Sequence, residues 1–321
     1  MDHRNGVLFM KKTFLGISSV ILFVSMLIFP KAVLLGASNG LLLWFHIIIP
    51  TLFPFLLLST FLLSTRNICY ITNMFGSFIS YIFGVSQPSS YCILVGFLCG
   101  YPLGAKTVAD FVRDGLISQE EGRYLLSFCN NTSPSFVMNY LVLKTLNKEK
   151  LLIPTLFILF FSSYLISIFE RKHYHFTPLD KHFLFHKPVW SIEAFDLAVL
   201  DTFESLVKIG GYIIFFSVLL TLCQQIPFRS PIFQIFFSSL EITNGLKLLM
   251  DLPFSFQARY ILCTGLTAFG GFCSVAQTNC MLHDTDLSIC SYTKQKLAAA
   301  VTASILCMLY CKIQYTLVSL F

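Results

Sequence analysis

The residues that could do chemistry in this chain lie where long apolar runs are interrupted. The first interruption, Gly100-Tyr101-Pro102, follows an apolar stretch with small residues four apart and precedes Lys106. Proline lacks the N–H that a helix interior needs, and glycine accepts backbone torsions that other residues avoid. In lipid, backbone groups freed in this way are tolerated where they face protein or a watery cavity. This stretch is therefore a candidate binding site.

A second interruption contains Asn130, Asn131, Thr132 and Ser133 and ends at Pro134. A run of polar and helix-breaking residues is costly in hydrocarbon unless the residues line something wet. We interpret this segment as a second discontinuous helix that supplies neutral hydrogen-bond donors.

Two charged residues lie within apolar segments. A lysine at the centre of a span costs roughly 2.5–3.5 kcal/mol, so a buried Lys106 is expected to be functional. The alternative is that its side chain reaches the interface at a helix end. Glu241 lies in the middle of residues 231–250 and is interpreted as an intramembrane acid that pairs with Lys106 or Lys208 or carries a coupling proton. The alternative is that this segment is interfacial and that Glu241 faces water.

An internal repeat connects the two halves of the chain. A shift of 171 residues aligns residues 100–106 with residues 271–277, so that Gln277 becomes the counterpart of Lys106. Corresponding interrupted segments in two halves point to a transporter site at their interface. The predicted substrate-binding residues from both halves are Gly100, Tyr101, Pro102, Lys106, Asn130, Asn131, Thr132, Ser133, Glu241, Asn244, Gly270, Gly271 and Gln277.

The composition indicates a polytopic all-α membrane protein. Of its 321 residues, 55% are hydrophobic and 12% charged, and the mean hydropathy is +0.74. A soluble domain carries about twice that share of charge. The formal charge of +6 comes from short basic segments between apolar runs, the usual pattern beside membrane spans. No basic patch with interleaved aromatic residues is present, so the expected partner is the lipid bilayer and not nucleic acid.

The order of the apolar runs predicts an N-terminal span and two pseudo-symmetric, inverted gate repeats with broken or re-entrant helices. A polar loop with four histidines, His173, His175, His182 and His186, is expected between the repeats. The predicted boundaries are residues 1–38 for the N-terminal span, 39–169 for the first repeat, 170–200 for the loop and 201–321 for the second repeat.

Enzyme chemistry is not expected, because the sequence contains no Ser/His/Asp set, nucleotide-phosphate loop or metalloprotease helix. The loop histidines have no cysteines near them, so a solvated loop is expected in place of a metal site. No cofactor is expected. An intramembrane enzyme that uses Glu241 and these histidines with a metal is the alternative.

Four motifs together resemble the YlbJ family of sporulation integral membrane proteins, part of the wider nucleoside-recognition or Gate-domain group. They are CGYPLGAK at residues 99–106, CNNTSP at 129–134, LEITNG at 240–245 and FGGFCSVAQ at 269–277. The resemblance implies an endospore-forming bacterium. It also implies transport of dipicolinic acid from the mother cell across the outer forespore membrane.

Dipicolinate is a flat pyridine with two carboxylates, so its carrier needs anion donors and an aromatic slot. Broken helices offer free N–H groups and the positive ends of half-helix dipoles. Lys106 is expected to add a positive charge and Tyr101 a ring. The alternatives are a scaffold of the sporulation machinery, or a gate-type transporter for nucleosides or metal ions. A homo-oligomer or sporulation membrane partners are further expectations.

Overall fold

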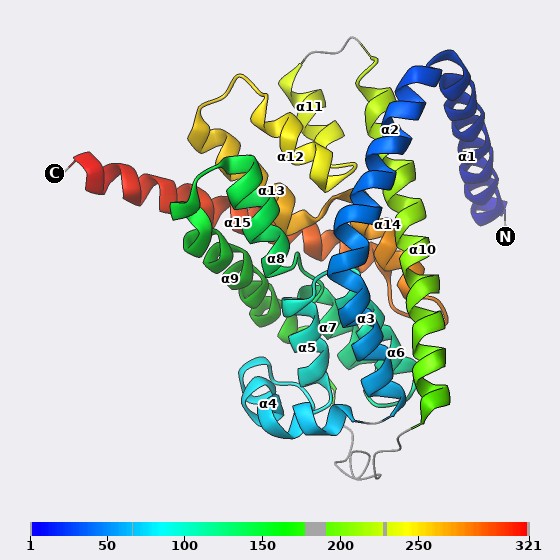
Figure 1. Cartoon of the computed structure of the whole chain (residues 1–321), viewed down its shortest axis with the longest axis vertical. Coiled ribbons are helices and arrows are strands. Elements are labelled where there is room, and N and C mark those ends of the chain that lie inside the picture. The colour runs from blue at the N-terminus through cyan, green and yellow to red at the C-terminus, as the bar shows by residue number, and fades with distance from the viewer. Residues whose placement is uncertain (1, 66, 177–190, 227–229, 320–321) are drawn as a thin grey trace.

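The computed structural model describes residues 2–65, 67–176, 191–226 and 230–319. Within these residues every regular element is a helix (Figure 1), as the apolar runs predict. The chain is an all-α polytopic membrane protein. The helical stretches that are long and apolar enough to cross a membrane are Pro30–Ser64, Glu149–Arg171, Ile192–Cys223, Phe256–Met281 and Ile289–Thr316.

A continuous rod follows the first helix, α1 (Asp2–Ile28). The rod consists of α2 (Pro30–Leu43), the π-helical turn η1 (Trp44–Ile48) and α3 (Ile49–Ser64). Proline residues in α3 remove backbone donors, and the π-helical turn directly precedes them. The predicted boundary after residue 38 falls inside α2, so the end of the predicted N-terminal span and the start of the first repeat belong to one rod.

Helix α10 (Ile192–Cys223) runs alongside this rod (Figure 1). The two backbones approach closely: a Cβ added at Gly40 of α2 would lie 2.7 Å from the Cα of Ile214. The helix begins after Ser191, whose hydroxyl accepts a hydrogen bond from the amide of Ala194. It therefore starts within residues 170–200, which we predicted as a polar loop. His182 and His186 of that loop lie outside the described residues.

The first half contains two discontinuous helices. Helix α5 ends at Leu98 and α6 begins at Leu103, while α7 ends at Phe128 and α8 begins at Pro134. The elements are α4 (Ile68–Phe83), α5 (Ser89–Leu98), α6 (Leu103–Arg113), α7 (Gln119–Phe128), α8 (Pro134–Phe136), the π-helical η2 (Val137–Leu146), η3 (Glu149–Leu151) and α9 (Leu152–Arg171). Both breaks lie where Gly, Pro and Asn predict them.

The second half also contains two discontinuous helices. It is made of α11 (Pro231–Ser238), α12 (Ile242–Met250), α13 (Phe256–Phe269), α14 (Gly271–Met281) and α15 (Ile289–Ser319). The break at Gly270 was predicted. The break between α11 and α12 was not, because residues 231–250 read as one apolar segment around Glu241. Glu241 is the N-cap of α12, so it begins a new helix.

The helix breaks of the two halves can be compared by their order along the chain. Breaks near residues 100 and 130 in the first half recur near residues 240 and 270 in the second. The shift of 171 residues instead pairs the first break of one half with the second break of the other. Figure 1 shows α5 and α6 toward one end of the long axis and α11 and α12 toward the other. This is the placement that inverted repeats require.

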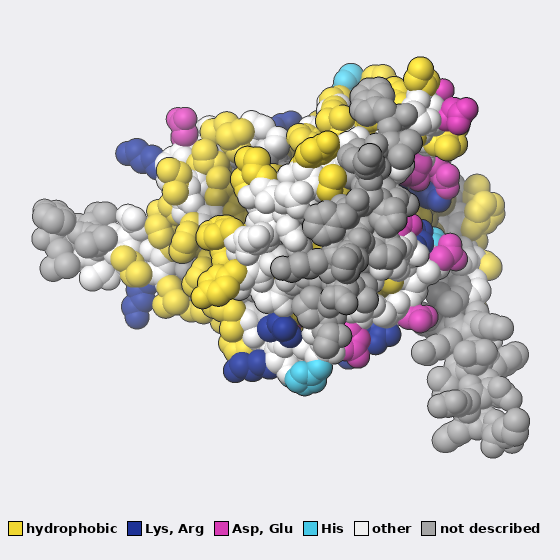
Figure 2. Space-filling model, turned by 90° about the horizontal axis from the view of Figure 1, so that it is seen from below, with side chains coloured by type: hydrophobic (Ala, Val, Ile, Leu, Met, Phe, Trp, Pro, Cys, Tyr) yellow, Lys and Arg dark blue, Asp and Glu magenta, His cyan; other side chains and the backbone are white. Residues whose placement is uncertain are grey.

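Large apolar side chains cover much of the outside of the molecule. Leu34 is 71% exposed, Ile153 79% and Ile232 77%. Seen from the lower end in Figure 2, hydrophobic side chains cover one flank, and most of the acidic side chains in view gather on the other. Such an apolar surface is stable against lipid tails and costly in water.

Candidate functional site

A cavity of about 320 Å³ lies where the breaks of the two halves meet. Its size falls within the usual range for small-molecule sites, roughly 300–1,000 Å³. One wall comes from the rod of α2, η1 and α3 together with Ile209 and Ile213 of α10. The predicted residues that line the cavity are Tyr101, Thr132, Ser133, Glu241, Gly270 and Gln277.

The two breaks of the first half are held together by main-chain contacts. The amide of Tyr101 donates to the carbonyl of Asn131 across 2.6 Å. Gly100 has φ = +86°, a conformation that favours glycine, and a Cβ added there would lie 2.7 Å from the amide nitrogen of Ser133. Pro102 follows as the N-cap residue of α6. Gly100 and Pro102 therefore shape the break and do not line the cavity.

The side chains of Asn130 and Asn131 bind protein groups and do not line the cavity. The Asn130 amide nitrogen donates to Thr278 and Tyr292, each across 2.9 Å. The Asn131 amide oxygen accepts from Ser163 across 2.8 Å. Both asparagines are buried, so their polar groups need these partners. The neutral donors predicted here thus belong to the framework, and the cavity receives only Thr132 and Ser133 of this segment.

A main-chain hydrogen bond also joins the two breaks of the second half, but here the donor follows the second break and the acceptor lies in the first. The amide of Phe272, just after the second break, donates to the carbonyl of Ser239 in the first break across 2.7 Å. Phe272 is the residue that the 171-residue shift pairs with Tyr101. The shift therefore pairs two equivalent amide donors, although they occupy different breaks. Gly271 lies against this contact and does not line the cavity.

Glu241 is buried at 2% exposure, and its carboxylate caps the N-terminus of α12. Oε1 accepts from the amide of Thr243 across 2.8 Å, and Oε2 accepts from the amide of Asn244 across 2.9 Å and from its side chain across 3.0 Å. A carboxylate at this position is favoured by the helix dipole. Asn244 therefore orients Glu241 and does not line the cavity itself. The predicted pairing of Glu241 with Lys106 or Lys208 does not occur.

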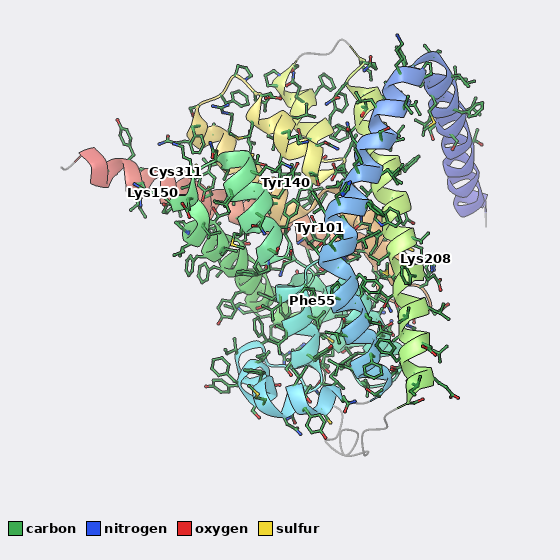
Figure 3. The ribbon with its side chains drawn as sticks, in the orientation of Figure 1. Phe55, Tyr101, Tyr140, Lys150, Lys208 and Cys311 are labelled. Atoms are coloured by element: carbon green, nitrogen blue, oxygen red, sulfur yellow. The ribbon has the colours of Figure 1, made fainter. Side chains whose placement is uncertain are left out.

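The halves touch each other at the cavity. A Cβ added at Gly270 would lie 3.2 Å from a carbon of the Tyr101 ring, so the glycine leaves room for that ring. Figure 3 shows Tyr101 near the middle of the molecule, with Tyr140 above and to its left. The cavity therefore lies between the two halves of the chain.

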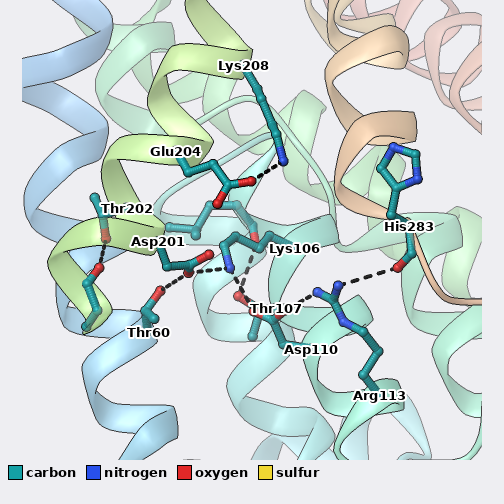
Figure 4. Close-up of polar contacts among 12 residues, drawn as sticks. Thr60, Lys106, Thr107, Asp110, Arg113, Asp201, Thr202, Glu204, Lys208 and His283 are labelled. Atoms are coloured by element: carbon teal, nitrogen blue, oxygen red, sulfur yellow. Dashed lines mark hydrogen bonds and ion pairs between the residues drawn. The ribbon is translucent and has the colours of Figure 1, made fainter. Parts of the chain in front are cut away.

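Lys106 lies outside the cavity, in a network of charges. Its Nζ donates to Asp110 across 3.2 Å and to Asp201 of α10 across 2.9 Å (Figure 4). Thr60 of α3 donates to the same oxygen of Asp201, and Arg113 pairs with Asp110. The lysine is buried with its charge balanced, and it joins α6 to α10. This placement differs from the anion-facing role that the sequence predicts.

Two basic residues at the cavity were not singled out from the sequence. Lys144 lies in η2 at the cavity edge, with its Nζ 5.3 Å from the centre of the Tyr140 ring. His46 lies in η1, which also lines the cavity. Lys144 belongs to a helix, because η2 continues to Leu146. A π-helical turn changes which side chains share a face, and no residue pattern marks these turns.

A metal centre is not formed by the described residues: none of their His, Cys, Asp and Glu side chains form a group of three that could hold an ion. His173 and His175 are exposed.

Comparison with known proteins identifies a relative. The chain is 24% identical, over 325 aligned positions, to the sporulation integral membrane protein YlbJ of Bacillus subtilis (strain 168). The alignment covers 89% of this chain and 79% of that protein. No family model matches the chain, and no solved structure matches it. The similarity supports the YlbJ family resemblance, and with the span-length helices it supports a sporulation membrane protein.

Proposed function

We propose that this sporulation membrane protein, a relative of YlbJ, transports dipicolinic acid across the outer forespore membrane without changing it chemically. The observation that carries the proposal is the cavity at the meeting point of four helix breaks from two repeats. Transporter sites commonly lie at such interfaces, because broken helices supply polar backbone groups there. A scaffold protein has no need for an internal cavity of this kind.

The lining of the cavity suits a flat aromatic dicarboxylate. The rings of Phe136 and Tyr140 stack with centroids 5.0 Å apart, and Tyr101 adds a third ring. Lys144 offers a positive charge at the edge, and His46 an imidazole N–H. We expect the pyridine ring to lie against the aromatic side chains and one carboxylate to bind Lys144, since charge-assisted hydrogen bonds are the strong ones.

Ser133 is suited to the second carboxylate. It lines the cavity, and its hydroxyl oxygen accepts from the amide of Phe136, so its own proton remains to be donated. The carboxylate of Glu241 also lines the cavity, and its negative charge repels a dianion. Its charge is offset by the two amide donors and the side-chain donor of the α12 N-terminus, which reduces the repulsion.

Exchange in liposomes tests this function. Purified protein is reconstituted, and counterflow of dipicolinate, nucleosides and ferrous iron is measured. Dipicolinate is expected to exchange without any partner protein, whether the chain is a monomer or a homo-oligomer. Exchange of nucleosides or iron alone, or of nothing until a sporulation membrane partner is added, would refute the assignment.

A pair of lysine variants tests the site itself. Lys144→Ala is expected to weaken dipicolinate binding about tenfold, the value of one charged hydrogen bond. Lys150→Ala is the matched control, because Lys150 is exposed and lies far from Tyr101 and Tyr140 (Figure 3). Equal affinities in both variants would remove Lys144 from the site.

A further inference from the structure

Lys296 is a buried lysine in the last span that the proposed site does not use. It lies in α15 and is 2% exposed, whereas Lys294, two residues earlier, is exposed. Its Nζ donates to the main-chain carbonyl of Asn130 across 3.2 Å. In the part of the chain that the structure describes, no carboxylate forms an ion pair with it.

The partner of Lys296 is the residue that connects the second break to three other elements. The side-chain oxygen of Asn130 accepts from the amide of Ala105 in α6 across 3.1 Å. Its side-chain nitrogen donates to Thr278 of α14 and to Tyr292 of α15. Thr278 is next to Gln277, which lines the cavity. Lys296 is thus connected to the cavity lining through the hydrogen bonds of Asn130 and Thr278.

The surroundings of Lys296 offer no fixed counter-charge. Cys129, the residue that follows α7, is the titratable group near it, and Tyr292 of α15 and the neutral Thr278 of α14 bind the side chain of its partner Asn130. Glu170 of α9 accepts instead from Gln295 across 3.0 Å. Ionisable side chains in such positions within membranes commonly belong to proton relays.

We propose that Lys296 is the proton-carrying group of this transporter, protonated while an anionic substrate occupies the cavity and deprotonated after its release. This deepens the proposed function and rests on it. The dianion supplies the negative charge that the ammonium lacks, so each stabilises the other, and by linkage the effect is reciprocal. On the receiving side the ammonium gives its proton to water, and on the other side the amine takes one from water. Proton and substrate therefore move in the same direction.

Lysine variants in liposomes separate coupling from transport. With an inward proton gradient, wild-type protein and Lys294→Met are expected to accumulate dipicolinate and acidify the lumen. Lys296→Met is expected to keep counterflow exchange but to lose accumulation about tenfold, within the usual range of coupling between sites. Accumulation at the wild-type level in Lys296→Met, or loss of both exchange and accumulation, would overturn the proposal.

A measurement without substrate decides the proposal even if dipicolinate is not the cargo. Hydrogen exchange of amides 129–133, corrected for intrinsic rates, is compared between mildly acidic and mildly alkaline buffer. Wild type and Lys294→Met are expected to lose protection in the alkaline buffer, because the ammonium no longer holds the Asn130 carbonyl. Lys296→Met is expected to show no such change. If wild type is also unchanged, Lys296 does not release its proton and the proposal fails.

If wild type shows no dipicolinate counterflow, the proposed substrate is wrong. The exchange of amides 129–133 then still tests Lys296, so the two failures are distinguishable.

Discussion

Lys106 of α6 donates to Asp201 of α10 across 2.9 Å, and this pair joins the first discontinuous helix to the long helix that begins the second half (Figure 4). The same ammonium binds Asp110 one turn further along α6. The lysine side chain is 8% exposed and that of Asp201 42%. A lysine held in this way is a structural link between the repeats and not a ligand of the cavity.

Removal of the Lys106 charge is therefore expected to cost stability and not substrate affinity. Lys106→Met leaves Asp201 without its cation and Asp110 with Arg113 alone. The expected loss is about 2 kcal/mol, between the values for exposed pairs and buried pairs. Thermal unfolding of the purified protein measures it. Lys208→Met is the control, because the pair of Lys208 with Glu204 is exposed. A stable Lys106→Met protein that no longer binds dipicolinate would contradict this interpretation.

The sequence predicts the helix breaks that special residues mark. Gly100, Pro102 and Pro134 cannot continue a regular helix, and each lies at a break. The break before α12 has no such mark, since Ser239 and Leu240 are compatible with a helix. It depends on Glu241, whose carboxylate replaces the backbone acceptors that the first amides of α12 lack. The acid within an apolar run therefore marked Glu241 as a special position, but it did not predict that a helix ends and another begins there.

The roles of the two lysines could not be predicted from local sequence. Lys106 has the position after a break that an anion ligand would have, but its partner Asp201 lies 95 residues away in the chain. Lys144 lies in no interruption or motif of the sequence, and its place at the cavity depends on the π-helical η2. Both assignments depend on tertiary contacts that no short motif contains.

The Glu241 carboxylate is expected to matter for folding more than for binding. Glu241→Ala leaves the amides of Thr243 and Asn244 without their acceptor, at a cost of about 1–2 kcal/mol. Glu241→Gln keeps one oxygen acceptor, so its loss of stability is expected to be smaller. Thermal unfolding compares the two variants with Glu193→Ala, a change in the exposed first turn of α10.

Glu241→Gln also tests how the negative charge of Glu241 affects the affinity for dipicolinate, because it changes the charge and keeps the size of the side chain. Glu241→Gln removes a negative charge near the dianion, so dipicolinate is expected to bind about fivefold more tightly, since one such repulsion is on the order of 1 kcal/mol. Calorimetric titration measures the affinity. If Glu241→Gln instead weakens binding, the carboxylate itself takes part in substrate recognition and the cargo is not a free dianion.

The close contact between α5 and the second break is expected to tolerate no side chain. A Cβ added at Gly96 would lie 1.9 Å from the carbonyl oxygen of Cys129, so Gly96→Ala must displace the segment that leads into Asn130. Overpacking of this kind costs roughly 1–3 kcal/mol. Dipicolinate binding is expected to fall as well, because Thr132 and Ser133 move with the segment. Thermal unfolding and calorimetric titration measure the two effects.

Gly211 of α10 is the matched control for Gly96. A Cβ added there meets nothing within 4 Å, and in a helix interior alanine is more stable than glycine by about 0.5–1 kcal/mol. Gly211→Ala is therefore expected to raise the unfolding temperature slightly and to leave binding unchanged. If Gly96→Ala is as stable and as active as Gly211→Ala, α5 does not pack against Cys129, and the first break cannot be held in the way described.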